Sequence, residues 1–140
     1  MKLERSGPPP VIDTKHNIPY LAGYSKNSRI VYIDNRLPEF FKQRNGKIVH
    51  VWKYISIHEE LEKDLIDKQG MTYHEAHEIA TAAEKTALVH AGYDWGEYER
   101  FLAPYIKMCD KECKNVPEDL DLTPYRLFPS DMARFFKDRS

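Results

Sequence analysis

The sequence predicts an α+β fold, with a small antiparallel sheet before residue 52 and three or four helices after it. Residues 29–34 read Arg-Ile-Val-Tyr-Ile-Asp, and this β-branched and aromatic composition is typical of a strand. Residues 72–75 and 94–97 have the spacing of a helix capping box. Hydrophobic residues make up 41% of the chain and charged residues 31%, which indicates a globular protein.

The length of 140 residues suggests one folded domain. Residues 1–19 contain three consecutive prolines and little apolar content, so they are expected to form an extended N-terminal arm. Residues 20–140 are expected to form a single α+β domain, since nothing between them reads as a linker.

Charge and hydropathy argue against two classes of partner. The formal net charge of −1 offers no bulk attraction to nucleic acid or to an acidic membrane. No apolar run approaches the roughly 20 residues of a transmembrane helix. The two cysteines are too few for a disulfide framework, so a cytoplasmic location is expected.

The strand predictions cover residues 20–25, 29–34 and 48–51. Between the last two, a short amphipathic turn passes through Phe40 and Phe41 to a turn at Asn45 and Gly46. A helix should follow and stop near Gly70, because glycine tolerates the left-handed conformation that ends helices.

Two further helices follow in the prediction. The second runs from the capping box at residues 72–75 to Gly92. The third begins at Asp94 and reaches about Cys113, and Pro104 should kink or split it. Residues 116–129 are expected to wrap over the helices in extended form, and Ser130 to cap a short terminal helix.

The first predicted helix carries the residues that indicate chemistry. His58 and Glu62 are four residues apart and share one helical face. They fall in an apolar stripe formed by Tyr54, Ile55, Leu61, Leu65 and Ile66, and the opposite side carries Ser56, Glu60, Lys63 and Asp64. A carboxylate in such a stripe must be neutralised, paired or bound to a cation, because burying a lone charge is costly. Glu59 lies at the edge of the stripe, where a general base would lie.

The second helix repeats this combination. His77 and Glu84 are seven residues apart, which places them two turns apart on one side of the helix. Their neighbours on that face are mostly small, so another helix can approach closely: Tyr73, Ala80, Ala87, Leu88 and Ala91. With the two faces together, the four side chains are expected to form a divalent metal site or a metal-free buried polar network, with placement on the helix surfaces as the third alternative.

The order of a small sheet, a His-Glu helix and a second acidic helix resembles the zincin metallopeptidases. Their His-Glu-x-x-His motif is matched at His58 and Glu59, whereas Glu62 replaces the second histidine. The resemblance implies a zincin-like fold, with His58 and Glu62 as metal ligands and Glu59 as the catalytic base. It favours Glu84 as the third ligand, whereas the sequence alone favours His77 equally.

A wider run of residues resembles uncharacterised phage and bacterial proteins, a likeness that implies no activity. It covers residues 31–34, the His58 motif, residues 73–84 and residues 119–125.

Two functions follow as hypotheses. The first is a metal-dependent hydrolase, a zincin-like peptidase or amidase with a peptide or protein substrate. Two histidines and two glutamates suit zinc, with manganese or iron(II) as alternatives. The second is a non-catalytic phage or bacterial accessory protein that binds a protein partner, with the same residues forming a structural metal site or a buried polar cluster.

Overall fold

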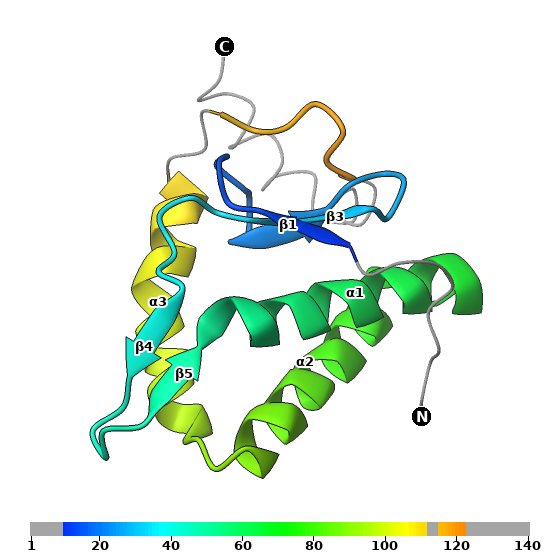
Figure 1. The fold of residues 1–140 in the computed structure, drawn as a ribbon. Helices are drawn as coiled ribbons and strands as arrows, with labels where there is room; N and C mark the ends of the chain where they lie inside the picture. Colours follow the sequence, from blue (N-terminus) through cyan, green and yellow to red (C-terminus); the bar gives the residue numbers. More distant parts are fainter. Residues whose placement is uncertain (1–9, 112–114, 123–140) are drawn as a thin grey trace.

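The structure is a computed structural model that describes residues 10–111 and 115–122. Its elements follow one another as β1 (Val11–Asp13), β2 (Ala22–Tyr24), β3 (Ile30–Ile33), β4 (Phe40–Lys42), β5 (Ile48–His50), α1 (Val51–Gln69), α2 (Tyr73–His90) and α3 (Trp95–Lys111). The α+β class is therefore confirmed, with all described strands before the first helix (Figure 1).

The strands form two small sheets rather than the single antiparallel sheet expected. In the first, with order β1-β3-β2, β2 pairs antiparallel with β3 but β1 pairs parallel with it. The second is a β4-β5 hairpin, so residues 40–42, expected as a turn, are a strand. Strand β1 lies within the residues that were expected to form an extended arm. It was not predicted because three prolines precede it and the strand has only three residues. From Val11 onward this segment is part of the fold, and Ile18 is fully buried.

Helix α1 is the middle layer of the molecule. The β1-β3-β2 sheet lies on one side of it and α2 crosses it on the other (Figure 1). Helix formers fill its second half, and Gly70 ends it in the left-handed conformation with φ 67°. Because two layers cover α1, Ser56 and Lys63 are buried although they lie on the side opposite the predicted stripe.

Helix α2 begins and packs as its sequence dictates. Thr72 accepts a hydrogen bond from the Glu75 backbone, and the Glu75 carboxylate accepts one from the Thr72 backbone, which confirms the capping box. The buried residues recur every four positions: Ala76, Ala80, Glu84 and Leu88. The two alanines are fully buried, so the backbones of α1 and α2 can lie close together.

Helix α3 continues through Pro104, which was expected to kink or split it. Asp94 accepts a hydrogen bond from the Glu97 backbone at 2.9 Å, as a helix cap should. Tyr98 and Leu102 are one turn apart, and both are buried in the main core. Cys109, beyond the proline, is buried in the same core, so α3 is anchored to the rest of the domain on both sides of Pro104.

The described part of the C-terminal segment, residues 115–122, packs mainly against the first sheet. Leu120 forms a β-bridge with Ser25 and a small core with Ile18 and Tyr32. This differs from the expected position over the helices, although Asp121 does reach Lys63 on α1 at 2.9 Å. The helix predicted after Ser130 and the position of Cys113 lie outside the described residues.

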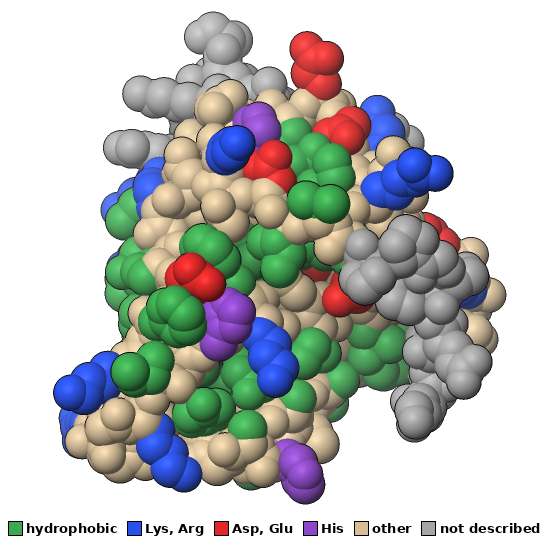
Figure 2. Space-filling view, in the orientation of Figure 1, with side chains coloured by type: hydrophobic (Ala, Val, Ile, Leu, Met, Phe, Trp, Pro, Cys, Tyr) green, Lys and Arg blue, Asp and Glu red, His purple; other side chains and the backbone are tan. Residues whose placement is uncertain are grey.

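The outer face shown in Figure 2 mixes apolar and charged side chains. Hydrophobic side chains lie across its middle, with side chains of both charges around them. The most exposed large hydrophobic residues of the described chain include Phe40 and Ile48 of the hairpin. Among the described helices, none combines the length and the hydropathy needed to cross a membrane.

Asp34, directly after β3, joins its own segment of the chain to the segment at Ile18. Its fully buried carboxylate accepts hydrogen bonds from the Ile18 backbone at 2.9 Å and from the Arg36 backbone at 3.0 Å. The Arg36 guanidinium donates two more, at 2.8 and 2.9 Å. Burial on its own would raise the pKa of Asp34, but these hydrogen bonds outweigh burial and lower it.

We expect Asp34→Asn to lower the free energy of unfolding by about 2 to 3 kcal/mol, because it weakens several charge-assisted hydrogen bonds at once. The folded pKa of Asp34 lies below the unfolded one, so its contribution is present at neutral pH and is lost as the pH falls below about 5. Urea unfolding at several pH values measures this. The control Asp64→Asn removes an i,i+4 surface pair with Lys68 and should cost less than about 0.5 kcal/mol. Equal losses in the two variants would contradict the prediction.

Candidate metal centre

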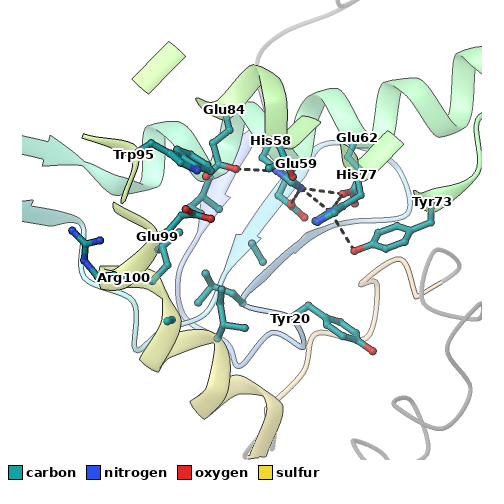
Figure 3. A pocket seen from close by; sticks show the side chains of 17 residues that line it. Tyr20, His58, Glu59, Glu62, Tyr73, His77, Glu84, Trp95, Glu99 and Arg100 are labelled. Carbon is teal, nitrogen blue, oxygen red and sulfur yellow. Dashed lines mark hydrogen bonds and ion pairs between the residues drawn. The ribbon is translucent and has the colours of Figure 1, made fainter. Parts of the chain in front are cut away.

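His58 lies between two carboxylates that come from different helices. Its Nδ1 is 3.0 Å from Oε1 of Glu84 on α2, and its Nε2 is 3.1 Å from Oε2 of Glu62 on α1. All three residues are buried, with exposed fractions of 7% or less. The helical faces on which these residues lie predicted a shared interface, and in the structure the side chains are in direct contact (Figure 3).

His77 completes a compact triangle of potential ligand atoms. Its Nδ1 is 3.2 Å from Nε2 of His58 and 3.0 Å from Oε2 of Glu62. Ligands of a tetrahedral zinc ion with bonds of 2.0–2.1 Å are about 3.3 Å apart. The three atoms therefore have nearly the separations of one face of a tetrahedral site. They are the group within the described residues whose side chains could hold a metal ion.

Glu84 lies behind this triangle rather than in it. It faces Nδ1 of His58, whereas Nε2 of His58 faces Glu62 and His77. Its other oxygen accepts a hydrogen bond of 2.6 Å from the fully buried Tyr98 of α3. A carboxylate in this position fixes the orientation of an imidazole and raises its basicity. Between the two candidates for a third ligand, the geometry favours His77 and gives Glu84 a supporting position.

Glu62 is held from its other side by the first sheet. Tyr24 of β2 donates to its Oε1 at 3.4 Å. The Lys63 ammonium lies 4.8 Å from the centre of the Tyr24 ring and also pairs with Asp121 at 2.9 Å. The sheet and the C-terminal segment thus both contribute to the position of Glu62.

Glu59 lies beside the triangle. Its Oε2 is 3.7 Å from Nε2 of His58, and 6% of the residue is exposed. Burial and the nearby Glu62 carboxylate raise the pKa of Glu59 to about 8, although His58 opposes part of this rise. A buried carboxyl group with a pKa near neutrality can both accept and return a proton.

His58 supplies positive charge to the cluster. Burial would lower the pKa of this imidazole, but the hydrogen bonds to Glu62 and Glu84 outweigh burial and raise it to about 10. For Glu62, burial would raise the pKa, but hydrogen bonds from His58 and His77 lower it. In the absence of a metal ion, the arrangement is therefore a protonated imidazole between two carboxylates.

Tyr73 packs beside the half-exposed His77 at the solvent side. The two rings stack with centroids 5.3 Å apart and an interplanar angle of 27°. The Tyr73 hydroxyl is also 3.4 Å from His77 Nδ1. The stacking limits rotation of the most exposed member of the triangle.

The triangle and Glu59 line a cleft of about 710 Å³. Helices α1 and α2 form one side, and α3 with the residues before and in β2 forms the other (Figure 3). The volume falls in the range of small-molecule and substrate sites, roughly 300–1,000 Å³. The arrangement can therefore place a ligand next to the ring nitrogens and carboxylates.

Sequence reasoning missed the two tyrosines that support the cluster, Tyr24 and Tyr98. Tyr98 shares its helical face with the buried Leu102, which was a signal for burial but not for a hydrogen bond to Glu84. Tyr24 reaches Glu62 only because β2 lies over α1, an arrangement that no local pattern specifies.

Comparisons with protein-family models, with curated proteins and with solved structures gave no match to this chain. The likeness to zincins therefore remains a prediction from the motif and the order of elements.

Tyr98→Phe should lower the free energy of unfolding by about 1.5 to 3 kcal/mol, because the buried carboxylate of Glu84 loses a hydrogen bond. The control is Tyr93→Phe, whose hydroxyl donates to the Ile48 carbonyl at an exposed position and should cost about 0.5 to 1 kcal/mol. Chemical denaturation of the two variants provides the comparison. A smaller loss in Tyr98→Phe than in Tyr93→Phe would argue against a structural role for the Tyr98–Glu84 bond.

Proposed function

We propose that this chain is a metal-dependent hydrolase of the peptidase or amidase type, with His58, Glu62 and His77 as ligands of one divalent ion. The observation that carries the proposal is the triangle of their ligand atoms, with sides of 3.0 to 3.2 Å, at the edge of a cleft. Two imidazoles and one carboxylate on one side of an ion leave positions for water and substrate, as catalytic sites require.

Each residue then has a distinct role. A bound divalent ion supplies Lewis-acid chemistry, since it polarises a carbonyl and makes a water more acidic. Glu59, whose Oε2 is 3.7 Å from Nε2 of His58, accepts the proton of the attacking water and returns it to the leaving nitrogen of the substrate. Glu84 and Tyr98 keep His58 in one orientation, and Tyr24 does the same for Glu62.

Zinc is the proposed metal. A set of two histidines and one glutamate is used by zinc hydrolases, and a neutral imidazole with a carboxylate also accepts manganese and iron(II). Elemental analysis of the purified protein separates these ions.

The second candidate is a non-catalytic accessory protein in which the same residues form a structural metal site or a buried polar cluster without an ion. One observation favours it: the same atoms lie at hydrogen-bond distances, and a protonated His58 balances its neighbouring carboxylates. In that case the cluster serves to join α1 and α2. Metal content tests whether the cluster binds an ion, and turnover decides between the two candidates.

Protein purified with zinc present should hold about one ion per chain and should unfold at a lower temperature after chelation, because bound metal adds to folding stability. His58→Ala, Glu62→Gln and His77→Ala should each lose the ion. Elemental analysis and thermal unfolding test this.

Two further variants refine the test of the metal site. Glu84→Gln should keep the ion but bind it about 10- to 100-fold more weakly, as expected for a supporting carboxylate. His74→Ala changes an exposed histidine of the same helix and should retain full occupancy. Full occupancy in His77→Ala would remove His77 from the proposed site.

Glu59→Gln should keep the ion and the fold but reduce turnover by at least about 100-fold, because an amide cannot accept the proton of the attacking water. Hydrolysis of a library of N-acetylated dipeptide amides, followed by mass spectrometry, measures turnover. Glu60→Gln is the matched control on the neighbouring position and should hydrolyse the library at the normal rate. Undiminished turnover in Glu59→Gln would exclude Glu59 as the base.

A further inference from the structure

The cleft beside the triangle has two chemically different walls. Helices α1 and α2 present the histidines and glutamates of the cluster, together with Ile55 and Thr81. Helix α3 presents Trp95, Leu102, Ala103 and Ile106. Ile106 is 44% exposed, so an apolar surface remains open opposite the polar one. A ligand that fits both walls has a polar group at one side and an apolar body at the other.

A strained backbone corner adds more apolar and aromatic surface. Tyr20 and Leu21 have φ angles of 62° and 83°, in the left-handed backbone region that residues other than glycine rarely adopt. Hydrogen bonds hold the corner, from the Leu21 backbone to the Ile18 carbonyl and from the Asp34 backbone to the Leu21 carbonyl. Both side chains line the cleft. Backbone strain of this kind concentrates where a ligand is held.

The charges of the cleft argue against anionic ligands. Four glutamates line it, Glu59, Glu62, Glu84 and Glu99, against a single arginine, Arg100. Arg100 lies well apart from His77, at the Trp95 and Glu99 end of the cleft (Figure 3). A divalent ion would offset part of the carboxylate charge, and Arg100 is the one lysine or arginine among the described residues that line the cleft.

We infer that the cleft binds an uncharged amide with an aromatic or branched apolar side chain, and that it rejects phosphate esters. The inference rests on the proposed function, for which it names the substrate class. The amide carbonyl faces the triangle, and the side chain lies between Leu21 and the α3 wall. Hydrophobic contact supplies affinity, and the glutamates supply the discrimination against anions.

Three probes test the inference: N-acetylphenylalanine amide, N-acetylglycine amide and phenyl phosphate. The protein is labelled with ¹⁵N at tryptophan and titrated both with zinc and after chelation. The Trp95 indole signal reports on the cleft, and that of Trp52 is an internal reference, because its indole donates to the Leu37 carbonyl and it does not line the cleft. The phenylalanine amide should shift the Trp95 signal saturably, with an affinity at least about tenfold above that of the glycine amide. Phenyl phosphate should bind at least about tenfold more weakly than the phenylalanine amide.

Ala103→Glu places a charge on the exposed apolar wall and should weaken binding of the phenylalanine amide at least about tenfold. Its matched control, Ala82→Glu, changes an exposed alanine of α2 that does not line the cleft and should bind the phenylalanine amide normally.

Three outcomes would overturn the inference: equal binding of the three probes, tighter binding of phenyl phosphate, or equal effects of the two variants. A side-chain preference in a protein that takes up no zinc would contradict the proposed function alone. Zinc uptake without a side-chain preference would contradict the substrate class alone.

Discussion

The contact of one buried imidazole with two carboxylates is the interaction on which the rest of the structure depends. His58 faces Glu62 on its own helix and Glu84 on the next, so the pairing of α1 with α2 and the geometry of the candidate centre are one feature. Fully buried alanines at Ala76 and Ala80 let the helices come close enough for these contacts. A larger residue at either position would separate the helices and lengthen the same hydrogen bonds.

The two candidate functions share a single electrostatic requirement. Glu62 and Glu84 are buried, and their charges must be balanced by a cation close to them. A proton on His58 offsets one of these charges. In the proposed metal site, an ion held by Nε2 would take the place of that proton. The supporting tyrosines, Tyr24 and Tyr98, contact the carboxylates rather than the ring, so neither depends on the state of Nε2.

The sequence predicted the features that depend on local spacing. The capping box placed α2, and helical periodicity brought His58, Glu62, His77 and Glu84 to one interface. The roles of His77 and Glu84 could not be separated in this way, because both lie on the same helical face and only the packing angle decides which ring nitrogen each one meets.

Features that depend on tertiary contacts could not be predicted from local spacing. The burial of Lys63 follows from two layers that cover α1 and from Asp121, which is 58 residues further along the chain. Strand β1 pairs in parallel with β3, although β2 lies between them in the sequence. A strand of three residues is too short for its sequence pattern to predict this pairing. Long-range packing, rather than local propensity, determined both outcomes.

Pro104 removes one hydrogen bond from the middle of α3. Proline has no amide hydrogen, so the carbonyl of Arg100 cannot receive the usual bond of an α-helix. The main core holds α3 on both sides of this position, through Tyr98 and Leu102 before the proline and Cys109 after it. Burial at both ends therefore compensates for the missing bond, and Ile106 can stay 44% exposed at the cleft wall without loosening the hold of Tyr98 on Glu84.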